Sequence, residues 1–185
     1  MTDVPALGSG LDWRPAAQAP DLLAAPVTAA LCELDGVAKQ TFVAPIDPSL
    51  ADTTAFCERY EIGLSVSANC VVIAGRRGGD VRYAACMVLA TTRADVNNVA
   101  RKRLDVRKAS FLATDEAVER SAMEYGGITP LGLPPDWPVL VDAAVAATPW
   151  VVVGSGVRRS KLALPGEALT LLPSAQVVDG LGRPG

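Results

Sequence analysis

The sequence contains no histidine, so the usual general base of enzymes that work near neutral pH is missing. Catalytic triads of the Ser-His-Asp type, Cys-His pairs and metal sites with imidazole ligands are therefore excluded. Cysteine is scarce, and no two cysteines have the Cys-x-x-Cys spacing of a zinc ribbon or a thioredoxin-type motif. We expect buried, reduced thiols at Cys32, Cys57, Cys70 and Cys86. An enzyme with this composition has to work by other means.

Long hydrophobic runs are also missing. The longest, such as Val139–Val141 and Val151–Val153, are bounded by Pro, Asp or Gly and are far too short to cross a bilayer. The first residues lack the positively charged segment and apolar stretch of a signal peptide. We therefore expect a cytoplasmic protein with no membrane partner.

The apolar residues that are present suffice for one folded domain. Of the 185 residues, 50% are hydrophobic and 20% are charged, and the net charge is −3. Residues 1–69 carry three basic and nine acidic side chains, whereas residues 70–185 carry fourteen and eleven. We therefore expect the cationic surface on the C-terminal two-thirds, with an excess too small for strong autonomous binding of nucleic acid.

Periodicity and turn residues predict a mixture of helices and strands. Asp52 is a candidate cap for a helix that ends at Tyr60, and the turn-rich stretch Gly75–Asp80 should connect two strands of a hairpin. The other helices are predicted at 27–35, 95–104, from 114 onward and at 166–172, and the other strands at 39–44, 109–113, 139–141, 150–153 and 162–164.

These elements predict an α+β fold, a single domain with a mixed, strongly curved β-sheet and flanking helices. Residues 1–25 are rich in Pro, Ala and Gly and should form an irregular N-terminal arm. The domain itself is expected at 26–174, followed by a flexible tail at 175–185.

The segment Gly126–Pro135 is the strongest candidate for a binding loop. Three Pro and three Gly in ten residues exclude regular structure. Glycine lets a ligand approach the backbone and meet its N–H groups, while proline fixes the shape of the loop. Such a loop can bind an oxyanion or a ribose without a catalytic side chain. The alternative is a rigid connection between a helix and a strand.

A second glycine turn, Gly154-Ser155-Gly156, is followed by Arg158, Arg159 and Lys161. It lacks the glycine-lysine spacing of a P-loop and does not open a clear helix, as a dinucleotide fingerprint would. The turn predicts either a second ligand contact or a hairpin turn with solvated charges.

The run Tyr125–Pro134, followed by Val139–Asp142 and the turn Gly154–Arg158, resembles the YbaK/ProX family. Members of this family are free-standing relatives of the editing domain inserted in bacterial prolyl-tRNA synthetases. The resemblance covers residues 28–172 and is most specific at Gly126–Pro130. It implies hydrolysis of the ester that joins a wrong amino acid to the 3′ end of a tRNA, an activity that protects translation fidelity.

The resemblance also carries site residues onto this chain. It implies catalytic roles in the loop for Gly126, Gly127, Thr129 and Pro130, and it matches the second glycine turn at Gly154 and Gly156. We further expect Ile128, Gly154, Gly156, Arg158 and Lys161 to bind the substrate. Asn69 stands where family members carry a lysine that helps to bind the tRNA end, and we expect it to orient that end. Many relatives have an acidic residue where this chain has Lys161. We therefore hypothesise that Lys161 restores the missing cation from the opposite side of the pocket.

The absence of histidine agrees with this activity. An aminoacyl ester is already activated, so attack by water needs alignment and oxyanion stabilisation more than a strong base. We expect an aminoacyl-tRNA deacylase without metal or cofactor, whose partners are the acceptor end of mischarged tRNA and an aminoacyl-tRNA synthetase. Basic residues expected to meet the acceptor stem are Arg101–Arg103, Arg107, Lys108, Arg158 and Arg159. The alternative is a non-catalytic protein that binds an aminoacyl, nucleotide or tRNA ligand and has lost turnover with the lysine.

Overall fold

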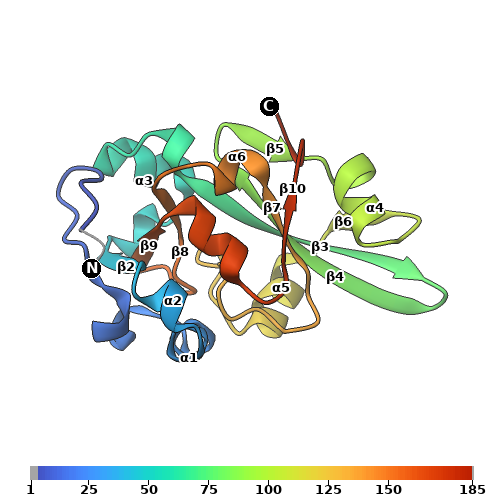
Figure 1. Ribbon diagram of the computed structural model, residues 1–185, viewed down its shortest axis with the longest axis horizontal. Coiled ribbons are helices and arrows are strands. Elements are labelled where there is room, and N and C mark those ends of the chain that lie inside the picture. The colour runs from blue at the N-terminus through green and yellow to red at the C-terminus, as the bar shows by residue number, and fades with distance from the viewer. Residues whose placement is uncertain (1–3, 185) are drawn as a thin grey trace.

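A long hairpin runs through the molecule and connects its parts (Figure 1). Its strands β3 (Ala68–Arg77) and β4 (Asp80–Leu89) pair antiparallel along their whole length. Gly78 and Gly79 form the turn with φ angles of 60° and 99°, which glycine adopts without strain. The computed structural model describes residues 4–184. The hairpin that the sequence predicts is therefore confirmed, and its far end projects from the rest of the molecule.

The hairpin belongs to a five-stranded mixed sheet with the order β10-β7-β4-β3-β6. β6 (Ala109–Phe111) pairs antiparallel with β3 at one edge. β7 (Val139–Asp142) is parallel to β4, and β10 (Ala175–Val178) is parallel to β7. A separate pair, β5 (Thr92–Ala94) with β11 (Gly182–Pro184), lies beyond the end of β4. The α+β class and the mixed sheet are thus as the sequence predicts.

A second sheet of four antiparallel strands adjoins the start of the hairpin. Its order is β1-β2-β9-β8, with β1 (Arg14–Pro15), β2 (Phe42–Pro45), β8 (Val151–Gly154) and β9 (Ser160–Leu164). An isolated bridge between Ser67 and Val152 joins the two sheets. The sequence predicts one curved sheet, whereas the structure has two separate sheets that meet at this bridge.

The helices are short, and aspartate caps fix the starts of several of them. The Asp52 side chain accepts a hydrogen bond from the Thr54 N–H at 3.0 Å, which confirms Asp52 as the cap of α3 (Thr53–Tyr60). Asp95 caps the π-helical turn Val96–Ala100 in the same way. The remaining helices are α1 (Ala25–Glu33), α2 (Asp35–Ala38), α4 (Arg101–Arg103), α5 (Thr114–Ser121) and α6 (Ala143–Ala146), with 3-10 turns at Ala16–Gln18, Pro20–Leu22, Pro48–Leu50, Leu64–Val66 and Gly166–Leu171.

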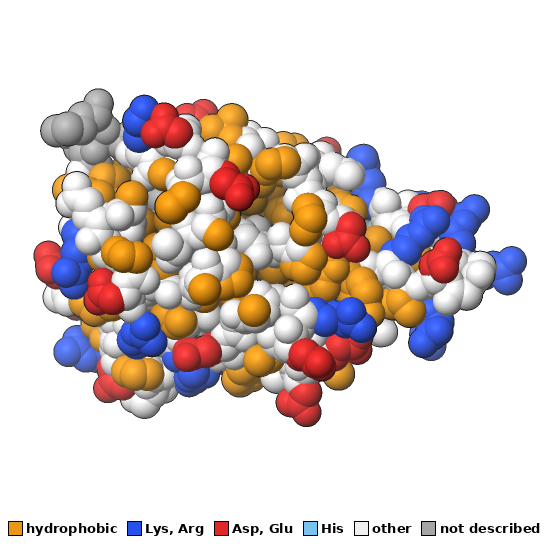
Figure 2. All heavy atoms as spheres, turned by 90° about the horizontal axis from the view of Figure 1, so that it is seen from below, with side chains coloured by type: hydrophobic (Ala, Val, Ile, Leu, Met, Phe, Trp, Pro, Cys, Tyr) orange, Lys and Arg blue, Asp and Glu red, His pale blue; other side chains and the backbone are white. Residues whose placement is uncertain are grey.

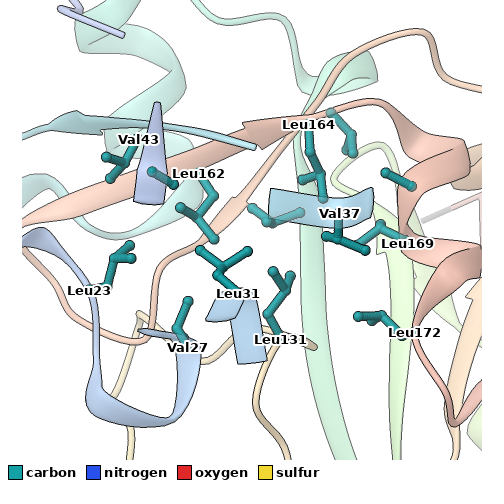
Figure 3. Packing of buried hydrophobic residues seen from close by; sticks show 14 of the residues in the cluster. Leu23, Val27, Leu31, Val37, Val43, Leu131, Leu162, Leu164, Leu169 and Leu172 are labelled. Atoms are coloured by element: carbon teal, nitrogen blue, oxygen red, sulfur yellow. The ribbon is translucent and has the colours of Figure 1, made fainter. Parts of the chain in front are cut away.

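The main hydrophobic core lies between the first two helices and the two sheets. Figure 3 shows Leu31 of α1 and Val37 of α2 packed with Leu162 of β9. Leu131, within the glycine-proline loop, is fully buried in the same cluster. The loop is therefore anchored in the core directly behind its glycines.

The structure corrects the expectation of a flexible tail at 175–185. Residues 175–178 form strand β10, and Leu181 is fully buried in a second apolar cluster beneath the hairpin. The sequence does not reveal this packing, because the strand is short and only one of its residues is buried. At the other end of the chain, Trp13, Leu22 and Leu23 of the predicted N-terminal arm are also buried.

Leu181→Ala should lower the free energy of unfolding by about 2–5 kcal/mol, because it leaves a cavity in a packed cluster. The control is Val177→Ala on the same segment, where the side chain is 50% exposed, and its effect should stay below about 1 kcal/mol. Urea denaturation of the full chain measures both changes. Two equally small effects would contradict a packed C-terminal segment.

Candidate active site

A pocket of about 340 Å³ opens where the two sheets meet. The starts of β3 and α3, the end of β8, Lys161 of β9 and the loop after α5 contribute to its wall. It is lined by Ala51, Asp52, Thr53, Ser67, Ala68, Asn69, Cys70, Tyr125, Gly126, Ile128, Val152, Val153, Gly154, Arg158 and Lys161. Asn69, Gly126, Ile128, Gly154, Arg158 and Lys161, which the sequence singles out, therefore lie in one pocket.

Glycine is required in the two turns because their backbones touch. A Cβ on Gly127 would lie 2.7 Å from the Val157 carbonyl oxygen, and a Cβ on Gly154 would lie 2.3 Å from the Gly127 oxygen. The Gly156 N–H donates to the Gly127 carbonyl at 2.7 Å, which fastens the second turn to the first. Gly127 and Gly156 thus hold the two loops together behind the pocket and do not line it.

Two residues of the first loop that line the pocket have backbone N–H groups that the protein does not use. Gly126 has a φ of 79°, in the region that favours glycine. Gly126 and Ile128 both line the pocket. Within residues 4–184, the N–H groups of these two residues have no hydrogen-bond acceptor. The loop can therefore offer two backbone donors to an oxygen of a ligand.

Arg158 holds this loop in place. Its guanidinium donates to the Tyr125 carbonyl and to the Pro48 carbonyl, each at 3.0 Å. Its backbone N–H donates to the Glu124 carboxylate at 2.6 Å. Arg158 lines the pocket. Its hydrogen bonds also hold the loop in position, a role that the sequence does not reveal.

Thr129 and Pro130 lie behind the loop. Both are buried and neither lines the pocket. The Thr129 hydroxyl has no hydrogen-bond partner among the described residues, and its N–H approaches the Met123 sulfur at 3.5 Å. The structure therefore places these residues in the support of the loop, away from the space that a ligand would occupy.

Asn69 is held by a residue that sequence reasoning missed. The Thr53 hydroxyl donates to the Asn69 side-chain oxygen at 2.7 Å, which directs the amide NH₂ away from α3. Thr53 is the first residue of α3 and lies beside the capping residue Asp52. The cap is visible in the sequence, but the contact between this helix and β3 is not.

Lys161 brings a buried cation to the pocket. Its side chain, on β9, is 6% exposed, and its ammonium donates to the Ala51 carbonyl at 2.9 Å and lies 5.3 Å from the centre of the Phe56 ring. Burial lowers the pKa of Lys161 to about 8, although the nearby Cys57 and Asp52 act in the opposite direction. The ammonium is therefore charged at neutral pH, and Lys161 lines the same pocket as Asn69.

The thiols are free, and only some match the expectation of burial. Burial raises the pKa of Cys57 and of Cys70, and it raises the pKa of Cys86 to about 12. Cys32 is exposed on α1, because it lies on the face of that helix away from the core, which corrects the expectation for this residue.

The other predicted basic residues do not line the pocket. Arg101–Arg103 form α4, and Arg107 and Lys108 precede β6 at the projecting end of the sheet. Arg159 instead donates to the Asp21 carbonyl at 2.5 Å and so binds the N-terminal segment to the second glycine turn.

Comparison with known proteins identifies the family. Residues 47–171 match the family described as aminoacyl-tRNA editing domain, and the chain belongs to that family. The resemblance to YbaK-type proteins is therefore confirmed. No curated protein matches the chain.

Solved structures with low sequence identity share the fold. One is described as a candidate trans-editing enzyme for prolyl tRNA synthetase, with a TM-score of 0.70, 18% identity, and coverage of 88% of this chain and 99% of that chain. A scaffold protein used for epitope grafting has a TM-score of 0.68, 20% identity, and coverage of 92% and 98%. A hypothetical protein has a TM-score of 0.70, 16% identity, and coverage of 83% and 99%.

Residues 4–184 lack two features. No helix there is long and apolar enough to cross a membrane. No group of three or more His, Cys, Asp or Glu side chains there could hold a metal ion.

The buried Lys161 should leave a signature in the pH dependence of stability. Its pKa is about 8 in the folded chain against an ordinary 10.5, so between these pH values the unfolded chain binds more protons at this site. The contribution of Lys161 to the free energy of unfolding is therefore lowest below pH 8 and rises from about pH 8 to 10.5.

Between these pH values, the free energy of unfolding of wild type should therefore rise relative to that of Lys161→Met by up to roughly 3 kcal/mol. One pKa unit corresponds to about 1.4 kcal/mol. Urea denaturation of both proteins at a series of pH values measures the difference. A difference that stays constant across the window would contradict the desolvated state of this ammonium.

Proposed function

We propose that the protein is a trans-editing hydrolase that cleaves the ester of mischarged aminoacyl-tRNA. The observation that carries this function is the pocket in which the unused N–H groups of Gly126 and Ile128 accompany Asn69 and Lys161. Backbone donors of this kind suit a developing oxyanion, and the amide and ammonium suit the polar end of an RNA. Membership of the editing-domain family supports the same substrate class.

In the proposed reaction, water attacks the acyl carbonyl carbon, and negative charge develops on the carbonyl oxygen. The N–H groups of Gly126 and Ile128 stabilise that oxygen from a backbone already fixed by Arg158 and the second glycine turn. When the tetrahedral intermediate collapses, the bond to the ribose oxygen breaks. The proton lost by the attacking water passes to that oxygen, and free tRNA and the amino acid leave. No histidine is needed because the ester is activated and the pocket supplies alignment.

The polar side chains hold the two parts of the substrate. Asn69 and Lys161 bind the ribose and phosphate of the terminal nucleotide, so that Lys161 supplies the cation that most relatives carry at the position of Asn69. Asp52 gives the pocket a carboxylate, which suits the free α-ammonium group of an aminoacyl ester. A volume of about 340 Å³ lies near the lower end of ligand sites, roughly 300–1,000 Å³. We infer that the acyl group is small.

A deacylation assay on tRNAs mischarged with different amino acids tests this function. We expect hydrolysis above the spontaneous rate for tRNAs that carry a small wrong amino acid, and little for correctly charged tRNAs. Absence of hydrolysis for every tRNA in the panel would refute the enzymatic function. Addition of the matching synthetase tests whether that enzyme is a partner that raises the rate.

A further inference from the structure

Two further hollows continue from the pocket along the surface. The nearer, of about 210 Å³, shares Cys70, Tyr125 and Ile128 with the pocket. The farther, of about 740 Å³, shares Phe111 and Leu112 with the nearer one. The three hollows have common walls and therefore form one track, which runs from the pocket past β6 to the projecting end of the hairpin.

Exposed aromatic rings mark the two boundaries along this track. Tyr125, between the pocket and the first hollow, is 64% exposed, and Phe111, between the first hollow and the second, is 65% exposed. Phe111 is the last residue of the edge strand β6. Aromatic rings at this exposure are available to stack with flat ligands, and every nucleic-acid base has such a face.

Cations line the far hollow. Arg76, Arg107 and Lys108 are exposed there, and none of them forms a salt bridge with another of residues 4–184. Arg120, in the same wall, differs because it pairs with Glu116 at 2.7 Å and lies 4.6 Å from the centre of the Tyr83 ring. Three positive charges are therefore free for an anionic partner.

One face of the molecule carries both apolar and cationic surface. Figure 2 shows hydrophobic surface leading from the centre of this face toward the projection, where Lys and Arg side chains gather. Apolar stacking surface next to the pocket, followed by cations farther away, is the arrangement found where proteins hold single-stranded nucleic acid.

We propose that this track binds the unpaired 3′ end of the tRNA whose ester the pocket cleaves. Tyr125 and Phe111 stack on bases next to the terminal ribose, and Arg76, Arg107 and Lys108 contact the phosphates that follow. The proposal rests on the proposed function, since that function places the aminoacyl end in the pocket. It adds a binding surface that begins at Tyr125 on the wall of the pocket and continues over Phe111 of β6 to the cations of the far hollow.

Equilibrium binding of uncharged RNA tests the track separately from catalysis. The probes are a fluorescent acceptor-stem hairpin with a single-stranded 3′ CCA tail and the same hairpin with a blunt end. Wild type should prefer the tailed RNA, and Phe111→Ala should lose about tenfold in affinity for it. Leu171→Ala is the matched control, because Leu171 is an exposed apolar residue outside the track and should keep the preference.

The charges are tested by salt dependence. Arg107→Gln combined with Lys108→Gln should reduce the slope of log affinity against log salt by about 0.7 per lost phosphate contact. Lys39→Gln, which removes an exposed charge at the end of α2 and outside the three hollows, is the control and should leave the slope unchanged.

Three results would overturn the track. They are equal affinity of wild type for tailed and blunt RNA, unchanged tail preference in Phe111→Ala, or an unchanged salt slope in the double variant. Either of the last two results would instead favour binding of a peptide strand to the exposed edge of β6. Tail-dependent binding without hydrolysis of any mischarged tRNA would refute the proposed function while supporting the track. Hydrolysis without tail preference would refute the track alone.

Discussion

Gly127→Ala should lower the rate of mischarged-tRNA hydrolysis by about 100-fold, because a shift of about 1 Å in a catalytic group has this effect. The new Cβ would lie 2.7 Å from the Val157 oxygen and 2.8 Å from the Val157 nitrogen. Both are backbone atoms that cannot rotate away, so the loop must move and carry the N–H groups of Gly126 and Ile128 with it. The overpacking should also lower the free energy of unfolding by roughly 1–3 kcal/mol.

Single-turnover deacylation and urea denaturation measure these two effects, and Gly36→Ala is the matched control. Gly36 lies within α2, and its added Cβ would meet open space, with nothing else within 4 Å. This control should gain about 0.4–1 kcal/mol of stability and keep the wild-type rate. A Gly127→Ala protein that hydrolyses substrate at the wild-type rate would contradict the role of loop geometry.

Lys161→Met should lower the rate of hydrolysis by about 10- to 100-fold, the effect of losing a hydrogen bond to a charged group. Its effect on stability near neutral pH should be small, because two changes oppose each other. The cost of burying the ammonium disappears, whereas the buried Ala51 carbonyl loses its donor. Activity and stability should therefore respond differently, as a substrate-binding role requires.

A rescue experiment asks whether Lys161 replaces the lysine that relatives carry at the position of Asn69. Asn69→Lys in the Lys161→Met background returns a cation to the same pocket from β3 and should recover most of the lost rate. Lys39→Met is the control for the loss of an exposed charge, since its ammonium pairs with Asp35 on the surface. Full activity of Lys161→Met alone would contradict the compensation.

Local signals in the sequence predicted much of the fold. Asp52 was identifiable as a cap because its side chain satisfies a free N–H at the start of α3, an interaction confined to neighbouring residues. The hairpin was identifiable because Gly78 and Gly79 interrupt two strand patterns. The strands of the C-terminal segment were not, because β10 depends on pairing with β7, which is distant in sequence.

In the candidate site, too, local features were predictable and contacts between distant segments were not. The glycine-proline loop was recognisable, but which of its residues would face the pocket was not, because that depends on a second turn near residue 155. Gly127 contacts Val157 across this interface, and Thr129 lies buried behind it. The contact of Thr53 with Asn69 also joins separate elements, so no local pattern announces it.

The measurement that tests the account most directly is deacylation of a panel of mischarged tRNAs by wild type, with Gly127→Ala alongside. The account predicts hydrolysis above the spontaneous rate for a tRNA with a small wrong amino acid, and a loss of about 100-fold in the variant. Wild-type protein that binds these tRNAs but hydrolyses none of them faster than water would contradict the account. It would favour the alternative of a non-catalytic protein that binds an aminoacyl, nucleotide or tRNA ligand.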